Sequence, residues 1–358
     1  MTENKVLVAM SGGVDSSVAA YLLKERGYGC VGVTMKLYGN EDAGMESDAP
    51  CCSQESADTA RGVARALGIP YYVFNFAPDF KKEVVGKFIE TYRAGGTPNP
   101  CIDCNRRIKF GKLLLRAREM DIGRVATGHY AVIERDESAG RYILKKSADK
   151  AKDQSYVLYA MTQEQLERVL FPLGPYRKTD IRAIAASLGL ANAHRRESQD
   201  ICFVSDGDYA GFIERYTGQA CEPGLFTDTG GNELGRHKGL IRYTVGQRRG
   251  LGLARGERLY VRSKDAAANT VTLCPEEGLY AKALCASDFN WLSCEPPSGS
   301  VRAKAKLRYR HEEQWAVAER ASPDTVRIEF DKPQRAIAKG QAVVLYSEDV
   351  VLGGGTIM

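Results

Sequence analysis

The first residues along the chain that could do chemistry form a short polar loop, Ser11-Gly12-Gly13-Val14-Asp15-Ser16. The apolar run Val6 to Met10 before it predicts a buried parallel strand, and the apolar run Val18 to Leu23 after it predicts a helix. A glycine turn between a strand and a helix presents backbone N–H groups and the positive end of the helix dipole. The loop therefore predicts a binding site for a phosphate or pyrophosphate group.

The side chains of this loop narrow the chemistry further. Gly12 and Gly13 allow the backbone to approach an anion closely, and the serines add hydroxyl donors. Asp15 is a carboxylate where a phosphate is expected, which is consistent with a Mg²⁺ ion between the two. The Gly-Lys-Ser/Thr ending of mononucleotide-binding loops is absent. The loop instead resembles the PP-loop of ATP pyrophosphatases, which cut ATP to AMP and pyrophosphate; an ordinary strand-to-helix turn with a serine cap is the alternative.

Two cysteines lie in a proline-framed loop, Thr97 to Asn105, with the spacing Cys101-x-x-Cys104. This spacing alone suits a redox pair, half of a metal site or a coincidence. A third thiol of interest, Cys202, lies where the alternation of strands and helices ends.

The first half of the chain alternates short apolar runs with longer amphipathic ones, which predicts a parallel sheet covered by helices. Ligands of such sheets bind at the carboxyl ends of the strands, where the loop of residues 11–16 would lie. Further strands are predicted at 30–37 and 71–76 and within 124–133, and helices at 53–67, 80–92 and 107–120.

The second half changes character near Ser205. A short helix is predicted at 206–218, and short alternating segments after 300 favour a small antiparallel β-barrel. Its strands are predicted at 301–309, 314–319, 325–330, 335–338, 342–346 and 350–357, with 290–300 as the link into it. The predicted domains are therefore 1–205, 206–288 and 289–358.

Composition sets broad limits on function. A chain of 358 residues with 44% hydrophobic and 27% charged residues can build two or three ordinary globular domains. Its 10 cysteines are too sparse for a disulfide scaffold, and neither a membrane span nor room for a signal peptide is evident, so a cytoplasmic location is expected. Nine Lys or Arg against one acid, Glu257, lie between Arg236 and Lys264; this block suits a polyanion or a solvated surface.

Taken together, these segments resemble the tRNA-specific 2-thiouridylase family, whose members replace the 2-oxygen of the wobble uridine with sulfur. The resemblance covers essentially the whole chain in order. Besides the PP-loop and the cysteine segments, it is carried by Gly128-His129-Tyr130, Lys152-Asp153-Gln154-Ser155-Tyr156, Tyr243 to Gly252 and Leu352-Gly353-Gly354-Gly355.

The resemblance implies a role for individual residues. It places ATP on Ala9, Met10, Ser11, Gly12, Gly13, Val14, Asp15, Ser16, Met35 and Gly128. It places the target base at Asn99, Pro100 and Cys101, with Cys104 as the nucleophile and Cys202 as the persulfide carrier. The remaining tRNA contacts are His129, Lys152, Asp153, Gln154, Arg308, Tyr309 and Gln341. Many members of the family have Asp where this chain has Cys101, which raises the question of a metal.

The implied reaction needs ATP, Mg²⁺, a tRNA anticodon stem-loop of the Lys, Glu and Gln acceptors, and a persulfide donor such as a cysteine desulfurase or a sulfur relay protein. Adenylation converts the uracil 2-oxygen into a leaving group, and sulfur then arrives from a Cys202 persulfide or as sulfide released by Cys104. Cations at Arg106, Arg107 and Lys109 suit either stabilisation of the Cys104 thiolate or a solvated helix face.

Several alternatives remain open from the sequence. Cys101, Cys104 and Cys202 could supply three thiolates to an iron–sulfur cluster or to zinc. The chain could also be another AMP-forming PP-loop synthetase, although no glutaminase segment is recognisable, or a non-catalytic RNA-binding protein with a vestigial ATP site.

Overall fold

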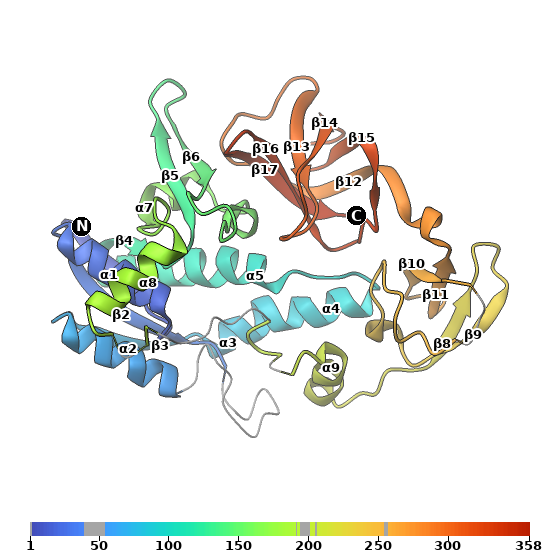
Figure 1. The fold of residues 1–358 in the computed structure, drawn as a ribbon, viewed down its shortest axis with the longest axis horizontal. Coiled ribbons are helices and arrows are strands. Elements are labelled where there is room, and N and C mark those ends of the chain that lie inside the picture. Colours follow the sequence, from blue (N-terminus) through green and yellow to red (C-terminus); the bar gives the residue numbers. More distant parts are fainter. Residues whose placement is uncertain (1, 39–53, 191, 194–200, 205, 254–256) are drawn as a thin grey trace.

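The computed structural model describes residues 2–38, 54–190, 192–193, 201–204, 206–253 and 257–358. Figure 1 shows an α/β unit, a small central unit and a β-barrel arranged around the helices α4 and α5. The predicted helix cap at Ser53 and residues 197–200, which precede the third cysteine, lie outside the described residues.

A five-stranded, wholly parallel sheet forms the α/β unit, as predicted. Its strand order is β3-β2-β1-β4-β7. Side chains of β1 alternate between the two faces: Val6 and Val8 pack into one apolar cluster, and Leu7 and Ala9 into another. The strands are β1 (Thr2–Ala9), β2 (Gly29–Lys36), β3 (Tyr71–Asn75), β4 (Ile122–Ala126) and β7 (Val169–Leu170).

Helices cover both faces of this sheet. Residues of α1 (Val14–Glu25), α2 (Gln54–Ala66) and α8 (Lys178–Ser187) pack with Val6 and Val8. The predicted helices at 80–92 and 107–120 cover the other face, and each contains a π-helical stretch. They run as α3 (Ala77–Phe80), η1 (Lys81–Gly86) and α4 (Lys87–Arg93), and as α5 (Pro100–Asp103), η2 (Cys104–Lys112) and α6 (Leu113–Glu119).

The region predicted to hold one strand, 124–133, holds parts of two. β4 ends at Ala126, and β5 (Ala131–Asp136) begins after four intervening residues and pairs with β6 (Arg141–Lys146) as a hairpin. The turn between them carries Gly128-His129-Tyr130. After β6 come η3 (Ser155–Leu158) and α7 (Gln163–Arg168).

The central unit is a four-stranded sheet of order β10-β11-β8-β9, preceded by α9 (Tyr209–Thr217). This helix starts later than predicted because the Asp208 carboxylate accepts a hydrogen bond from the Gly211 N–H at 2.9 Å and caps it. Gly218, at φ 65°, ends it. The strands are β8 (Gly224–Thr227), β9 (Glu233–His237), β10 (Tyr260–Asp265) and β11 (Thr270–Cys274), with short 3₁₀ turns η4 (Leu240–Arg242) and η5 (Glu276–Leu279).

The C-terminal unit is the predicted antiparallel barrel. Six strands follow the order β12-β15-β14-β13-β16-β17, and pairing of β12 with β17 closes the ring. The strands are β12 (Tyr280–Trp291), β13 (Val301–Lys306), β14 (Gln314–Arg320), β15 (Val326–Arg335), β16 (Ala342–Ser347) and β17 (Val350–Ile357). The hairpin of β5 and β6 extends this sheet through the pair Val350 and Lys145.

Two details of the predicted barrel are wrong. A separate strand at 335–338 does not form, because β15 ends at Arg335 and Ala336 adopts a left-handed φ of 54° that turns the chain. The boundary predicted between 288 and 289 falls inside β12, whose pairing with β15 and β17 belongs to the barrel. We propose that the C-terminal unit begins at Tyr280.

Within the described residues, no helix is long and apolar enough to cross a membrane.

Replacing Phe88 by Ala tests how far the second face of the sheet depends on one aromatic side chain. Phe88 is fully buried and packs edge-to-face on Tyr92 and Phe203. We expect the free energy of unfolding to fall by about 3–5 kcal/mol in urea titrations, because the truncation removes packing and leaves a cavity. Tyr72 on the edge strand β3 is 48% exposed, so Tyr72→Ala should cost less than about 1 kcal/mol. Equal losses in the two variants would contradict this assignment of the core.

Candidate active site

The loop of residues 11–16 lies at the carboxyl end of β1, as predicted, and its own hydrogen bonds shape it. The Ser11 N–H donates to the Ser16 hydroxyl at 3.1 Å, and the Ser16 and Ser17 hydroxyls donate to the Gly13 carbonyl at 3.0 Å each. Gly13 is the extended N-cap of α1, so the first N–H groups of this helix have no intrahelical acceptor. The turn therefore has the backbone donors that an anion site needs.

Two glycines are required by close packing around the loop. Gly12 has φ +74°, and a Cβ atom there would lie 2.4 Å from the Ser56 carbonyl oxygen. Gly128, at the end of the neighbouring strand β4, passes so near that a Cβ would lie 2.8 Å from the Ser16 nitrogen. Gly128 is thus brought against the predicted ATP residues Asp15 and Ser16, and Met35 is half-buried on the adjacent strand β2.

Asp15 has two partners that the sequence did not reveal. The Lys178 ammonium donates to both carboxylate oxygens, at 2.7 and 2.8 Å, and the Tyr130 hydroxyl donates to one of them at 2.7 Å. Lys178 is buried at the start of α8, whereas the Asp15 side chain is 30% exposed. A lysine in the first turn of a helix is unfavourable for the helix dipole. In the sequence, only this unfavourable position of Lys178 in the helix indicated that the side chain binds something else.

Asn192 is a second residue that sequence reasoning missed. Its amide nitrogen donates to the Gly12 carbonyl at 2.8 Å and to the Ser17 hydroxyl at 3.0 Å. Its side-chain oxygen is buried, and no hydrogen-bond partner for it lies among the residues that the structure describes. Asn192 therefore holds the glycine turn through the Gly12 carbonyl and the Ser17 hydroxyl.

These residues fit the phosphates of a nucleotide better than they fit a metal ion. The backbone N–H groups of the α1 start, the serine hydroxyls and the Lys178 ammonium are all donors. The Asp15 carboxylate, the predicted neighbour of Mg²⁺, is instead neutralised by Lys178. Within the described part of the chain, no three His, Cys, Asp or Glu side chains converge as metal ligands.

The cysteines of interest differ in exposure. Cys101 is exposed on α5, Cys104 is buried at the first residue of η2, and Cys202 is partly buried. Cys104 belongs to the apolar cluster that contains Ala9, and Cys202 packs against this same cluster. The structure thus brings two of the three thiols to one cluster, below the strand that leads into the PP-loop.

Aromatic rings fix the Cys202 segment on this cluster. Phe203 packs edge-to-face on Phe80 and Phe88, with ring centroids 5.6 and 5.1 Å apart. The Tyr38 hydroxyl donates to the Cys202 carbonyl at 2.7 Å. The backbone is therefore anchored at the Cys202 carbonyl and at the following residue, Phe203.

Charged residues near Cys104 are engaged with other parts of the chain. Lys87 on α4 donates to the buried Asp103 carboxylate at 2.6 Å; burial raises the pKa of Asp103, and Lys87 opposes that rise. Arg106 forms an ion pair with Asp288 of β12, so it joins the α/β unit to the barrel. The sequence suggested either stabilisation of the Cys104 thiolate or a solvated helix face for Arg106, and not this contact between units.

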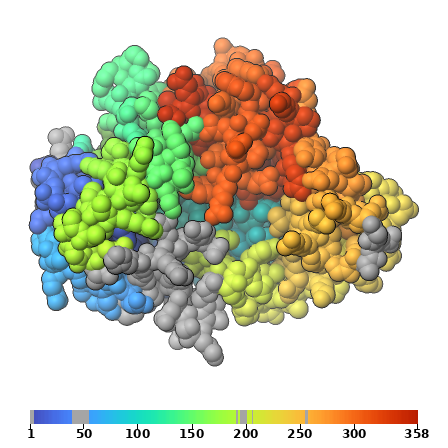
Figure 2. Space-filling model, in the orientation of Figure 1, coloured from blue at the N-terminus to red at the C-terminus, as the bar shows by residue number. Residues whose placement is uncertain are grey.

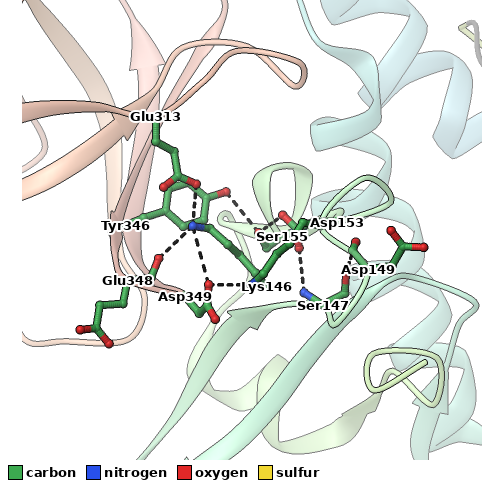
Figure 3. Close-up of polar contacts among 10 residues, drawn as sticks. Lys146, Ser147, Asp149, Asp153, Ser155, Glu313, Tyr346, Glu348 and Asp349 are labelled. Atoms are coloured by element: carbon green, nitrogen blue, oxygen red, sulfur yellow. Dashed lines mark hydrogen bonds and ion pairs between the residues drawn. The ribbon is translucent and has the colours of Figure 1, made fainter. Parts of the chain in front are cut away.

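The predicted tRNA contacts of the 152–154 segment lie where the α/β unit meets the barrel (Figure 3). Asp153 is buried and accepts from the N–H of Ser147 at 3.0 Å and the hydroxyl of Ser155 at 2.7 Å. The Ser155 hydroxyl also lies 3.2 Å from that of Tyr346 on the barrel strand β16. The Asp153 side chain therefore faces inward and holds the segment in place. The neighbouring Lys152 on this segment is half-buried.

A partly buried ion pair lies beside this segment. Lys146 of β6 pairs with Glu313 of the barrel at 2.6 Å, donates to the Glu348 carbonyl at 2.8 Å and covers the Tyr346 ring (Figure 3). The hairpin and the barrel are thus held together by charge as well as by strand pairing.

The other predicted tRNA contacts are partly inward-facing too. His129 is buried against Phe110 and Phe171, and burial lowers its pKa well below the usual range. Gln154 accepts from the Tyr130 N–H at 2.9 Å. Arg308 and Tyr309 are exposed in the loop after β13, and Gln341 is half-buried before β16.

Figure 2 shows the surface hollowed between the barrel and α9, with blue-green atoms of the chain around residue 100 visible on its floor. Asn99 caps α5 in an extended conformation, and buried Pro100 is the first residue of that helix. The predicted base-contacting residues therefore open the helix that leads to Cys104.

Breaking the ion pair of Asp15 and Lys178 should lower the free energy of unfolding. Asp15→Asn keeps the side-chain shape but leaves a buried ammonium without its counter-ion. Because Asp15 is partly exposed, the loss of unfolding free energy should be about 3 kcal/mol or somewhat less.

The double variant Asp15→Asn with Lys178→Met separates this structural cost from nucleotide binding. It should recover most of the stability in urea titrations yet still bind ATP more weakly than the wild type in calorimetry. A single variant as stable as the wild type would show that the ion pair contributes little.

Three family models match the chain in succession. They are described as the tRNA methyl transferase HUP domain at 4–206, the tRNA methyl transferase PRC-barrel domain at 210–275 and the aminomethyltransferase beta-barrel domain at 281–357. Solved structures are more distant: an NMN synthetase of Francisella tularensis matches 62% of this chain and 79% of its own at 15% identity and a TM-score of 0.35. At a TM-score this low, the likeness indicates no function for this chain.

Full-length relatives are much closer. The chain is 49% identical over 353 residues to a tRNA-specific 2-thiouridylase of Clostridioides difficile, covering 99% of this chain and 98% of the relative. It is 49% identical over 358 residues to that of Acetivibrio thermocellus, covering both chains completely. Two of the domain models are described by a methyl transferase name, whereas these relatives are named 2-thiouridylases and match this chain from end to end. The chain therefore belongs to the tRNA-specific 2-thiouridylase family.

Proposed function

We propose that this chain catalyses the ATP-dependent 2-thiolation of the wobble uridine of tRNA, by adenylation followed by transfer of a cysteine-bound sulfur. It is a sulfurtransferase of the ATP-binding HUP class. The observation that carries the proposed mechanism is the apolar cluster that contains Ala9, Cys104 and Phe203. The cluster contains Ala9 before the PP-loop, the candidate nucleophile Cys104 and Phe203, the neighbour of Cys202, which supports a common site for the loop and the two thiols.

In the first step the uridine 2-oxygen attacks the α-phosphorus of ATP. An oxygen–phosphorus bond forms, the bond to the β-phosphate group breaks, and pyrophosphate leaves. The N–H groups of the α1 start suit the charge on the departing pyrophosphate. Lys178 would add a cation there by shifting from Asp15 to the phosphates.

In the second step sulfur replaces the activated oxygen. An external persulfide donor loads Cys202, and the terminal sulfur attacks C2 of the uracil, from which AMP leaves with the former 2-oxygen. The Cys104 thiolate then attacks the Cys202 sulfur. The bond to the transferred sulfur breaks, its electrons stay on that sulfur as 2-thiouridine, and a Cys104–Cys202 disulfide forms, which an external thiol reduces.

The substrate and donor are proposed from the family resemblance. They are the anticodon stem-loops of the Lys, Glu and Gln acceptors, and a cysteine desulfurase or sulfur relay protein, in the cytoplasm. The exposed Arg248 and Arg249 of the central unit and Arg308 and Tyr309 of the barrel support a polyanionic partner.

The two thiols should behave differently when each is replaced by Ala. Cys202→Ala should abolish thiolation and leave ATP-dependent adenylation of tRNA intact, because adenylation needs only the loop and a positioned base. Cys104→Ala, preloaded with sulfur, should stop at a covalent tRNA–Cys202 adduct under direct persulfide attack, because the thiol that releases the product is missing, and at adenylated tRNA without sulfur transfer under sulfide release.

A single-turnover assay with metal analysis of each variant distinguishes these routes from a cluster mechanism. A cluster predicts that Cys101→Ala, Cys104→Ala and Cys202→Ala lose iron and activity together. Cys294→Ala, which changes a half-buried thiol at the start of the link after β12, is the matched control. Multiple turnover by Cys202→Ala would contradict the assignment of the persulfide.

Affinity for tRNA should fall steeply with salt, because phosphate contacts release counterions. Arg248→Ala with Arg249→Ala should reduce the slope of log K against log salt by about 1–2. Arg116→Ala with Arg118→Ala removes the same charge from α6, where both side chains pair with acids, and should leave the slope near its wild-type value. Equal slopes in the two double variants would exclude Arg248 and Arg249 from the RNA interface.

A further inference from the structure

Residues 95–98, which connect α4 to α5, are held by all three units of the structure. The segment enters Asn99, Pro100 and Cys101, the proposed contacts of the target base, and then Cys104. Gly95, Gly96 and Pro98 are buried although the segment has no regular structure. Its backbone groups therefore need partners from elsewhere.

The central unit supplies one partner. The Lys264 ammonium of β10 donates to the Gly96 carbonyl at 3.2 Å and to the Tyr243 carbonyl at 2.9 Å, and it lies 5.7 Å from the centre of the Tyr92 ring. Tyr243 is the first residue of the Tyr243–Gly252 motif that carries Arg248 and Arg249. One side chain thus joins the basic motif to the segment that precedes the target base.

The barrel supplies the other partners. The Gln341 amide donates to the Thr97 carbonyl at 2.9 Å and lies 3.4 Å from that of Pro98. The Thr97 N–H donates to the Lys339 carbonyl at 2.8 Å. The amide of Gln341 is therefore committed to the chain's own backbone in this structure.

Glycines allow the three backbones to meet. Gly95 has φ +80°, and a Cβ there would lie 3.3 Å from the Lys264 carbonyl oxygen. Gly340 has φ +86°, and a Cβ there would lie 3.1 Å from the Thr97 nitrogen. Lys264 is half-buried, and its burial lowers its pKa to about 8. These contacts are close enough that a shift of the central unit or of the barrel would move residues 95–98.

We infer that Lys264 and Gln341 are positioning residues for thiolation. They hold residues 95–98 in place between the central unit and the barrel, and so set the position of Asn99 to Cys104 relative to the RNA-facing surfaces of those units. This inference rests on the proposed function, since it concerns the placement of the target base. Neither side chain need touch the reacting atoms.

Lys264→Met tests the inference, because it keeps an apolar stem and removes the donors. Hydrogen exchange of the peptide covering 91–104 should rise by about tenfold, since a hydrogen bond from a charged group is lost. The single-turnover rate at saturating tRNA should fall by about tenfold or more, because misplacement of the base slows the chemistry. The Kd for tRNA should change much less than the rate.

Gln341→Glu is the second variant, and it removes the contact that the barrel makes with residues 95–98. It is nearly isosteric but replaces a donor by an acceptor, so exchange in 91–104 should rise as in Lys264→Met. Lys282→Met removes the same charge as Lys264→Met from a side chain that is 59% exposed on β12, and should match the wild type in both measurements.

The outcomes separate the inference from the proposed function. Unchanged exchange in both variants would overturn the contact, and increased exchange with an unchanged thiolation rate would overturn the positioning role. A weaker Kd that accounts for the whole loss of rate would mean that Lys264 only attracts RNA. A wild-type chain without thiolation activity would overturn the proposed function and the positioning role with it, whereas a loss confined to the variants supports both.

Discussion

The apolar cluster between the parallel sheet and the α3–α4 and η2–α6 helices is the constraint on which the active site depends. It is built from one face of β1 and β2 and from aromatic side chains such as Phe80, Phe88 and Phe203. Because Ala9 and Cys104 belong to it and Cys202 packs against it, one packing arrangement sets both the nucleotide loop and the thiols. Side chains in a dense apolar core cannot move independently, so a substitution in this cluster is expected to displace the loop or the thiols as well.

The charge of the loop is balanced before any nucleotide binds. Lys178 satisfies both oxygens of Asp15, and Tyr130 reinforces the pair. An anionic ligand at the α1 start would compete with Asp15 for the same ammonium. The chain therefore pairs a buried lysine with a carboxylate beside the glycine turn, which explains how the lysine is accommodated there.

Several residues that resemble RNA contacts of the family face inward here. Asp153 caps backbone N–H groups at the hairpin–barrel junction, His129 is buried between aromatic rings, and Gln341 holds the Thr97 carbonyl. Asp153 and Gln341 lie at junctions between units whose outer surfaces carry exposed cations, whereas His129 packs within the α/β unit. Recognition of RNA and placement of the base would then depend on the same interfaces, even where no side chain reaches the nucleic acid.

The sequence by itself determined the strand–loop–helix at the start, the parallel sheet and the antiparallel barrel, because apolar periodicity and turn glycines are local signals. It also placed Cys104 and Cys202 as the thiols of interest through the family resemblance. Only the tertiary structure decided that β12 belongs to the barrel, that Lys178 neutralises Asp15 and that Lys264 holds Gly96. Each of these is a contact between residues more than about 60 positions apart along the chain, and a buried polar group takes its partner from whatever the packed fold brings near it.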